Sequence, residues 1–299
     1  MAIPLVDVHQ HLWDLDHFEL PWLSSVPALN DHYRMSRYLE EANGVEVAKT
    51  VYMEVDVAPG QIGMEADFVL GLIDADDNPM AGATLRARPG EADFGDHVSR
   101  FASDDRVKGY RQVLQIPELG PGHCLSDAFI RDVRKLGEQG KHFDICMRPA
   151  ELGDGVKLVE ACPDTRFVVD HCGNAHVEIV NGSASPDEVD PGGMPHDADQ
   201  WRRDMEALGA RENTICKISG IIARLPEGNN AAETLAPTVN HCLETFGADR
   251  VVFGSDWPVC TLGAAYPTWV NALANIIADR SEDDQRKFWS GNAERFYTL

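Results

Sequence analysis

Short apolar runs recur along the chain and alternate with segments whose apolar residues follow a helical period. The runs cover residues 5–8, 49–55, 80–85, 107–113, 143–147, 167–170, 214–218 and 251–254. Two intervening segments, 64–73 and 234–246, place apolar residues three and four positions apart, which predicts helices. Strands that alternate with helices in this way favour a parallel sheet with helical crossovers.

The apolar runs are nearly continuous, as in Phe167-Val168-Val169, which is typical of strands covered on both faces. Eight units of strand and helix predict a closed (β/α)8 barrel, a single α/β domain over residues 1–299, since such barrels commonly reach this length. A doubly wound open sheet is the alternative. A nucleotide-binding sheet would need a glycine-rich loop after an early strand, and residues 7–13 contain no glycine.

The stretch from residue 174 to residue 200 interrupts this pattern. It is polar and rich in turn formers, including Asn181-Gly182 and residues 191–193. A loop of this length beside a strand end is usually functional or disordered. We therefore expect either a flap over a site or an excursion across the surface.

Acidic residues dominate the charge of the chain. Asp and Glu number 49 against 26 Lys and Arg, so the formal net charge is −23 at pH 7. This charge repels nucleic-acid phosphates and anionic membranes, which leaves a small molecule as the expected partner and a homo-oligomer as an open alternative. No apolar run reaches about 18 residues and the N-terminus lacks a leader pattern, so we expect a cytoplasmic protein.

Seven cysteines are scattered without a Cys-x-x-Cys pair, and several lie in apolar runs. An odd number argues against a complete disulfide framework. We therefore expect reduced thiols that pack as small hydrophobic side chains.

The C-terminal ends of the strands supply the catalytic groups in a barrel of parallel strands. In an extended segment residues two apart project to the same side, so His9 and His11 can share one metal ion or one substrate. The residues that end or follow the eight runs are His9, His11, Glu54, Arg86, Arg111, Gln112, Arg148, His171, Ser219 and Asp256.

Three histidines and one aspartate in this set have the chemistry of a metal site. Imidazole nitrogens and carboxylate oxygens both bind Zn²⁺ and similar ions, and the candidate ligands are His9, His11, His171 and Asp256. A bound ion would lower the pKa of water toward neutrality, and Asp256 could accept a proton from that water. The predicted chemistry is hydrolysis, with Asp256 and His171 as catalytic residues.

Four segments carry these histidines, the aspartate and neighbouring aromatic residues: Asp7-Val8-His9-Gln10-His11-Leu12-Trp13, Pro21-Trp22-Leu23, Val168-Val169-Asp170-His171-Cys172-Gly173 and Phe253-Gly254-Ser255-Asp256-Trp257-Pro258. Together they resemble the amidohydrolase superfamily, specifically its amidohydrolase-2 branch of sugar-lactone and related lactone hydrolases. The resemblance spans nearly the whole chain. It implies a (β/α)8 barrel in which the three histidines bind metal or substrate and the aspartate activates water.

The chain departs from superfamily members that hold two metals. Those proteins usually bring a lysine or glutamate from the fourth strand and a histidine from the fifth, whereas these positions here hold Arg111 or Gln112 and Met147 or Arg148. The resemblance therefore favours one divalent ion, with zinc expected. The same branch resembles lactonases that need no metal and polarise the carbonyl with histidines and arginines, so a metal-independent mechanism is the alternative.

Further side chains are candidates for contact with substrate. A guanidinium offers a planar fork of donors to carbonyl or carboxylate oxygens, which favours Arg111 and Arg148, with structural ion pairs as the competing role. Glu54 either completes a metal shell, binds substrate hydroxyls or pairs with an arginine. Trp13 and Trp257 are expected to stack on a ring because they lie close to His11 and Asp256 in the sequence.

Two other residues receive weaker roles. Trp22 is a further candidate for stacking on a ring. Lys217 lies in the alternating segment 216–220 and is expected to point away from the barrel axis.

These candidates predict an enzyme that hydrolyses the lactone of a small sugar acid. The preference for a sugar lactone comes from the resemblance to fuconolactone and rhamnonolactone hydrolases. Non-oxidative decarboxylation of an aromatic or muconate-type acid around one metal ion is the alternative. A barrel that only binds a ligand is a third possibility. Asp256 argues against it, because a binding protein gains little from a carboxylate beside the attacking water.

Overall fold

The eight expected apolar runs are the strands of one sheet. The computed structural model describes residues 3–75, 78–116, 118–189, 196–225 and 231–299. The strands lie in chain order, and every neighbouring pair is parallel. They are β1 (Leu5–Gln10), β2 (Val47–Met53), β3 (Met80–Arg86), β4 (Val107–Val113), β5 (His142–Cys146), β6 (Arg166–Val169), β7 (Thr214–Ile218) and β8 (Val251–Phe253).

The sheet closes between the ends of β8 and β1. The backbone N–H of Asp256 donates to the carbonyl of His9 at 2.8 Å, and the N–H of His11 donates to the carbonyl of Trp257 at 2.8 Å. Gln10 and Trp257 form a parallel bridge between the same segments. The predicted (β/α)8 barrel is thus confirmed, and the open doubly wound sheet is excluded.

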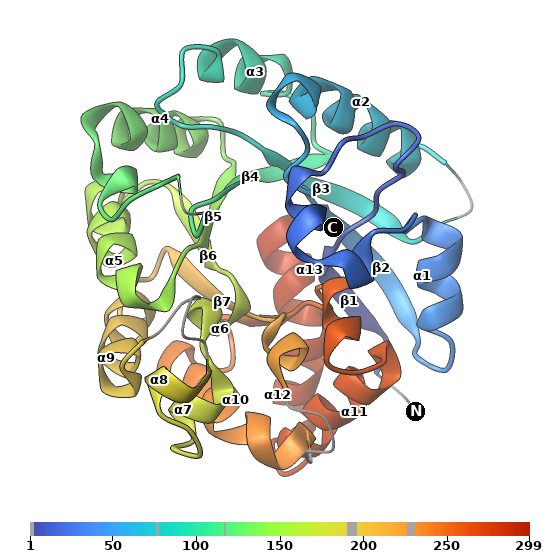
Figure 1. Ribbon diagram of the computed structural model, residues 1–299, viewed down its shortest axis with the longest axis vertical. Helices are drawn as coiled ribbons and strands as arrows, with labels where there is room; N and C mark the ends of the chain where they lie inside the picture. The colour runs from blue at the N-terminus through green and yellow to red at the C-terminus, as the bar shows by residue number, and fades with distance from the viewer. Residues whose placement is uncertain (1–2, 76–77, 117, 190–195, 226–230) are drawn as a thin grey trace.

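Helices surround the strands, as Figure 1 shows. The predicted helices over 64–73 and 234–246 are α2 and α10. The helices are α1 (Met35–Glu41), α2 (Ile62–Ile73), α3 (Phe94–Arg100), α4 (Asp127–Glu138), α5 (Leu152–Ala161), α6 (His171–Asn174), α7 (Val177–Val180), α8 (Pro186–Val189), α9 (Ala198–Gly209), α10 (Ala231–Phe246), α11 (Tyr266–Ile276), α12 (Glu282–Arg286) and α13 (Asn292–Tyr297).

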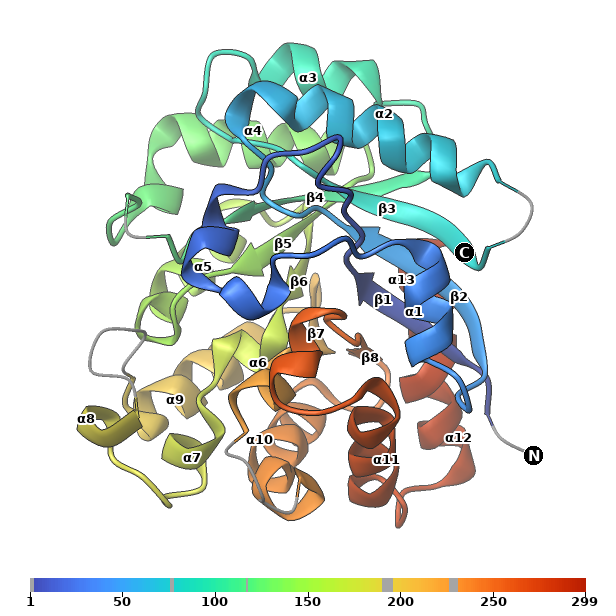
Figure 2. The same cartoon turned by 45° about the vertical axis from the view of Figure 1, so that its right-hand side comes forward.

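The polar stretch 174–200 contains the short helices α7 and α8 and the start of α9. Val177 and Val180 of α7 are buried, and α7 packs against α10, near which Figure 2 also draws it. The α7 part of this stretch is therefore packed onto the outer helices, whereas residues 181–188 are mostly exposed. The turn residues 191–193 lie outside the described residues.

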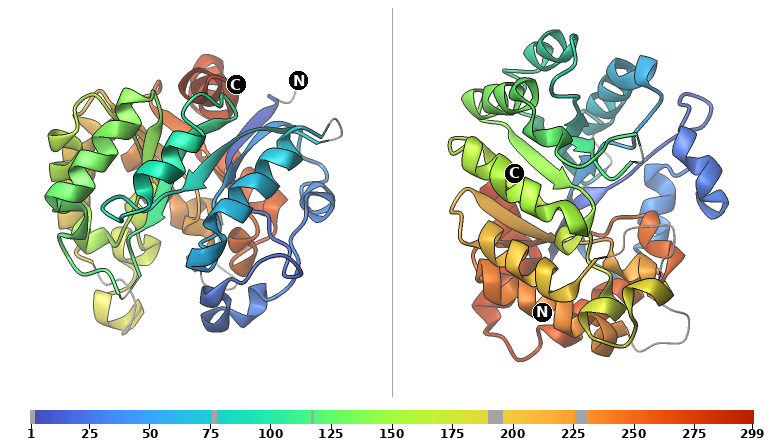
Figure 3. Two further views of the ribbon diagram at one scale, coloured as in Figure 1. Left: turned by 90° about the horizontal axis from the view of Figure 1, so that it is seen from above. Right: turned by 60° about the vertical axis from the view of Figure 1, so that its left-hand side comes forward.

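The barrel interior is apolar at one end and charged toward the other. Six side chains from the strands pack there against Ala293 and Tyr297 of α13; they are Val6, Val8, Val51, Val168, Ile215 and Val252. Figure 3 shows this C-terminal helix at one end of the barrel. Its packing closes that end.

Lys217 lies inside the barrel, so the expectation that it points away from the axis is wrong. It is two residues after Ile215 and therefore shares its interior side. Its Nζ lies 2.7 Å from Oδ2 of Asp144 on β5 and 2.8 Å from Oδ1 of Asp170 after β6, and none of these side chains is exposed. The two carboxylates stabilise the buried cation and make an interior orientation favourable.

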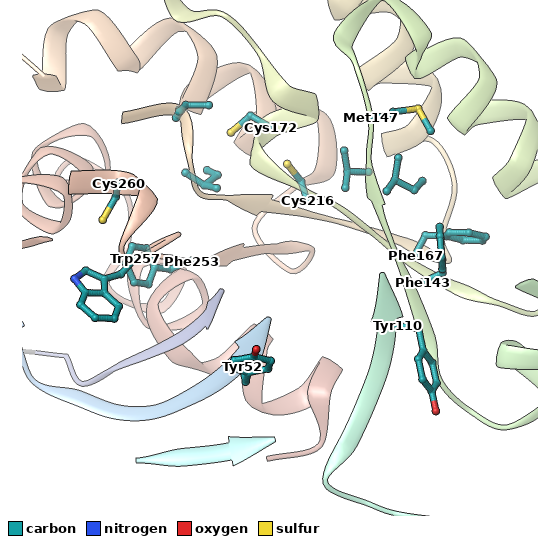
Figure 4. Close-up of a cluster of buried hydrophobic side chains, with 14 of the residues drawn as sticks. Tyr52, Tyr110, Phe143, Met147, Phe167, Cys172, Cys216, Phe253, Trp257 and Cys260 are labelled. Atoms are coloured by element: carbon teal, nitrogen blue, oxygen red, sulfur yellow. The ribbon is translucent and has the colours of Figure 1, made fainter. Parts of the chain in front are cut away.

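A second, larger apolar layer fills the space between the strands and the helices. Figure 4 shows Phe143 and Phe167 together in this layer, with ring centroids 6.5 Å apart and nearly perpendicular planes. All seven cysteines are free and buried, as expected for reduced thiols. Among the described residues, no helix combines the length and apolar character needed to cross a membrane.

Replacing Lys217 with Met should lower the free energy of unfolding by about 3–5 kcal/mol, because Asp144 and Asp170 would remain buried without their shared cation. Urea denaturation measures this change. Lys157→Met is the matched control, since Lys157 is 63% exposed in its pair with Asp154 and its replacement should leave the free energy of unfolding nearly unchanged. Equal losses in the two variants would contradict the stabilising role of the buried cation.

Candidate active site

Asp7 holds together the two segments that carry His9 and Asp256. Its Oδ1 accepts hydrogen bonds from the backbone N–H of His9 at 3.2 Å and of Ser255 at 2.8 Å. Its Oδ2 accepts from the Tyr38 hydroxyl at 2.9 Å. Burial raises the pKa of Asp7, and these donors oppose the rise. The carboxyl group thus sets the ends of β1 and β8 relative to each other.

His11 points its Nε2 atom at the Asp256 carboxylate, and in the neutral ring this nitrogen carries a lone pair. Its Nδ1 lies 2.9 Å from the carbonyl oxygen of Met53, which can only accept, so Nδ1 carries the proton. Its Nε2 lies 3.1 Å from Oδ1 of Asp256. Two acceptors at this distance repel each other unless a proton or a cation lies between them. Histidines that bind a metal through one nitrogen commonly donate from the other nitrogen to a backbone carbonyl, as Nδ1 of His11 does.

His9 lies deeper than His11 and is fully buried. Its Nε2 lies 3.5 Å from Oδ1 of Asp256 and 3.3 Å from Nη1 of Arg111. Its Nδ1 lies 3.6 Å from Oδ1 of Asp170, beyond hydrogen-bond distance. His9 is therefore placed between two carboxylates and a guanidinium.

His171 begins a turn of left-handed backbone. Its φ is 52°, and the next three residues have φ values of 53°, 65° and 56°. Residues other than glycine adopt this region at a cost of about 1–2 kcal/mol each, and such strain is concentrated at functional sites. The turn places Nδ1 of His171 2.9 Å from the Ser219 hydroxyl oxygen and 4.0 Å from Oδ2 of Asp256.

Gly220 leaves the space that these side chains occupy. Its φ is +67°, and a Cβ atom there would lie 2.4 Å from Nδ1 of His171 and 2.9 Å from Oδ2 of Asp256. A side chain at this position would therefore collide with two candidate catalytic groups.

Three of the four predicted ligands form one group in the structure, and the fourth, His11, contacts Asp256 of that group. One ligand atom from each of His9, His171 and Asp256 lies within 4.8 Å of the others, which is close enough to hold one metal ion. Burial lowers the pKa values of His9 and His171, which favours the neutral rings that metals bind. Burial alone would raise the pKa of Asp256, but His171 and the other imidazoles lower it to below its ordinary value, so the carboxylate is ionised.

A cavity of about 390 Å³ opens onto this cluster. Its reactive side contains His11, His171, Gly220 and Asp256. Its apolar walls include Val55, Val113, Ile116, Ile221 and Val259. A volume of this size suits a small molecule.

Arg111 lines the cavity, but its donors are engaged within the protein. Its Nε donates to Oε1 of Glu54 at 2.7 Å, and its Nη2 donates to the Glu54 carbonyl at 2.8 Å. Glu54 is fully buried and does not line the cavity, and of the roles expected for it the structure shows the ion pair with an arginine, here Arg111. Arg111 keeps one edge toward the cavity and His9.

Arg148 does not line the cavity, and of the two roles expected for it the structure shows the structural ion pair. Its two terminal nitrogens donate to the carbonyls of Ile116, at 3.1 Å, and Leu119, at 2.5 Å. It also pairs with Glu151 at 2.8 Å. The guanidinium thus ties the loop after β4 to the start of α5.

Trp13 and Trp257 are buried in packing next to the site and do not line the cavity, which corrects their predicted stacking on substrate. Trp13 Nε1 donates to the carbonyl of Asp31 at 2.7 Å, and Trp257 Nε1 donates to the Glu41 carboxylate at 2.7 Å. Their indole N–H groups are satisfied away from the cavity. Trp22, the further aromatic candidate, does line the cavity.

Sequence reasoning missed several residues that support or line the site. Asp170 is the residue before His171 in the Asp-His-Cys-Gly segment, and its position two residues after Val168 predicts the same interior side. Asp56 and Gln115 line the cavity from loops. Side chains in loops do not alternate in direction as they do in strands, so the sequence pattern does not predict which of them face the cavity.

The chain belongs to the amidohydrolase family, whose family model matches residues 6–299. It is accordingly an enzyme of a family of hydrolases. The chain is 26% identical to an L-fucono-1,5-lactonase of Burkholderia multivorans over 98% of this chain and 96% of that protein. It is 21% identical to an L-rhamnono-gamma-lactonase of Scheffersomyces stipitis over 99% of this chain and 98% of that protein.

Solved structures share the fold. An amidohydrolase from Burkholderia multivorans with bound zinc matches with a TM-score of 0.83 and 22% identity over 99% of both chains. A dihydroxybenzoic acid decarboxylase from Polaromonas, with bound manganese and an inhibitor, matches with a TM-score of 0.66 and 12% identity over 100% of this chain and 98% of that one. At these identities the structural matches establish the barrel fold.

Gly220→Ala should lower hydrolytic turnover by more than about 100-fold, because the new Cβ displaces His171 or Asp256 from a geometry that catalysis requires. Gly140→Ala is the control: its φ is +71°, and a Cβ there meets nothing within 4 Å. Both variants should lose about 1 kcal/mol of stability through backbone strain. Steady-state kinetics and thermal denaturation separate the two effects, and an active Gly220→Ala enzyme would show that the glycine is not needed.

Proposed function

We propose that this enzyme hydrolyses a small, uncharged lactone of a sugar acid. The observation that carries the proposal is the ionised Asp256 carboxylate, which lies among His9, His11 and His171 at the inner end of the cavity. Hydrolysis of an ester needs a proton acceptor for water and positive or donor groups for the oxyanion, and this cluster supplies both. The lactonase names of two relatives support the choice of ester.

In the proposed reaction, water attacks the ring carbonyl carbon while Asp256 takes one of its protons. The bond between this carbon and the ring oxygen then breaks, and the ring oxygen takes the proton from Asp256. The product is a hydroxy acid, which releases a proton at neutral pH. His171, which lines the cavity, holds the water or the carbonyl oxygen in place, and the edge of Arg111 that faces the cavity stabilises the oxyanion.

The donor set fits one divalent ion, and we propose zinc. Neutral imidazoles and a carboxylate are the ligands that zinc prefers, and Nε2 of His11 lies 3.1 Å from Oδ1 of Asp256. His9, His11, His171 and Asp256 would hold the ion. When bound, it would lower the pKa of water and polarise the carbonyl.

A metal-independent reaction is the second candidate mechanism, and one contact favours it. Nη1 of Arg111 lies 3.3 Å from Nε2 of His9, where it donates to the lone pair that a metal would use. In that case the guanidinium is the permanent cation of the site. The two mechanisms differ in whether the activity requires a metal.

Asp256→Asn should lower turnover of the lactone by about a thousandfold, since the amide cannot accept the proton of water. Proton release in a weakly buffered indicator assay measures turnover, and circular dichroism checks the fold. Asp249→Asn, which changes a 66%-exposed side chain just before β8, should keep its activity. Full activity of Asp256→Asn would contradict the proposed role of Asp256 as the proton acceptor. Release of carbon dioxide from an aromatic acid by the wild-type enzyme would instead favour decarboxylation as the function.

Enzyme purified without added metal should contain about one equivalent of a divalent ion per chain. A strong chelator should remove the ion and lower turnover at least tenfold, and Zn²⁺ should restore it, because the ion supplies the activated water. Elemental analysis and the same indicator assay measure these changes. Undiminished turnover with less than about a tenth of an equivalent of metal would establish the metal-independent mechanism.

A further inference from the structure

The cavity has two walls of different chemistry. The candidate reactive residues follow β6, β8 and β1, and Gly220 follows β7, so they occupy one continuous arc of the closed barrel. The opposite wall follows β2 and β4, and the segment Pro21–Ser25 of the connection after β1 adds Trp22 to the cavity lining. Arg111 of β4 takes part in the reaction proposed above, but Asp56 and Gln115, the other polar side chains that these loops present to the cavity, have no role in it.

Asp56 is held in a strained position at the cavity. Its φ is 52°, in the left-handed region. Its backbone N–H donates to Oε2 of Glu54 at 2.7 Å, and its Oδ1 lies 2.5 Å from Nη2 of Arg86. The side chain remains 22% exposed, and the carboxylate has a second oxygen with its own lone pairs. The contacts with Glu54 and Arg86 therefore keep Asp56 in its strained backbone conformation, with a carboxylate oxygen beside the cavity.

Gln115 adds a second acceptor to the same wall. Its Oε1 is buried, and among the described residues it has no hydrogen-bond partner. A buried carbonyl without a donor is unfavourable, so an arrangement of this kind favours a ligand or a water molecule that donates to it. The residue lines the cavity, and rotation of its terminal amide would turn Oε1 toward a bound molecule.

Trp22 supplies an apolar surface beside these acceptors. Its Nε1 donates to the carbonyl of Val55 at 2.8 Å, and its ring meets Trp13 edge-on at 5.6 Å. The indole is therefore fixed in orientation. An immobile aromatic surface next to hydroxyl acceptors matches a saturated ring that carries hydroxyl groups at its edge and C–H groups on its face.

We propose that Asp56 and Gln115 accept hydrogen bonds from the hydroxyl groups of the lactone and that Trp22 covers its ring, so that this wall selects polyhydroxylated lactones. The inference rests on the proposed lactone hydrolysis and assigns its specificity to residues that take no part in the reaction. A carboxylate on this wall also disfavours substrates with a negative charge at the same place.

The test compares two neutral classes of lactone that share the reacting ester. A panel of aldono-1,5-lactones carries ring hydroxyls, whereas δ-valerolactone has none. Gln115→Met and Asp56→Asn should each lower kcat/KM for the best aldonolactone about tenfold, the change expected for one lost hydrogen bond, and mainly through KM. Both should leave kcat/KM for δ-valerolactone within about twofold.

Gln112→Met is the matched control. Gln112 is a nearby glutamine whose Oε1 is also buried without a described partner, but it does not line the cavity. Its substitution should leave the ratio of the two kcat/KM values unchanged. Trp22→Ala should lower kcat/KM for both classes, because the indole contacts the ring and not its hydroxyls.

The outcomes separate this inference from the function on which it rests. If wild-type enzyme opens lactones and the ratio is unchanged in both Gln115→Met and Asp56→Asn, the hydroxyl-binding wall is wrong while lactone hydrolysis stands. If wild-type enzyme opens no lactone of either class, the proposed function fails and the inference fails with it. Because the two substitutions are independent, misfolding of one variant leaves the other as a complete test.

Discussion

The closure of the barrel between β8 and β1 is the constraint on which the site depends. The backbone hydrogen bonds that join His9 to Asp256 and His11 to Trp257 complete the sheet. The same bonds bring two candidate ligands from opposite ends of the chain into one space. Asp7 secures this join with a carboxylate that accepts from both segments. Sheet closure and assembly of the site are therefore one structural event.

Buried charge surrounds this join in compensating pairs. Lys217 lies between two carboxylates, and Arg111 pairs with Glu54. In a low-dielectric interior such pairs hold one another in place and maintain a fixed field around the reacting groups. Strain is concentrated in the same region, where His171 and Asp256 both have positive φ. The closed barrel supplies the rigidity that keeps these unfavourable conformations in place.

The division of the cavity into two walls follows from the same topology. Groups that end β6, β8 and β1 are neighbours because the barrel is closed, and those that follow β2 and β4 must face them across the cavity. Asp56 and Gln115 lie in the loops after β2 and β4, apart from the segments that carry the candidate ligands, so they can change without altering those ligands.

The barrel and the approach of His9, His11, His171 and Asp256 to one another could be predicted from the amino-acid sequence. Apolar runs mark every strand, and the carboxyl ends of parallel strands lie at the same end of the barrel, so residues at those ends are brought together by the fold. Which neighbouring side chains reach the cavity could not be predicted and depends on tertiary contacts. Trp13, Trp257 and Arg148 find hydrogen-bond partners elsewhere, whereas loop paths turn Trp22, Asp56 and Gln115 inward. The physical reason is that loop side chains follow no period, and their direction depends on partners far away in the sequence.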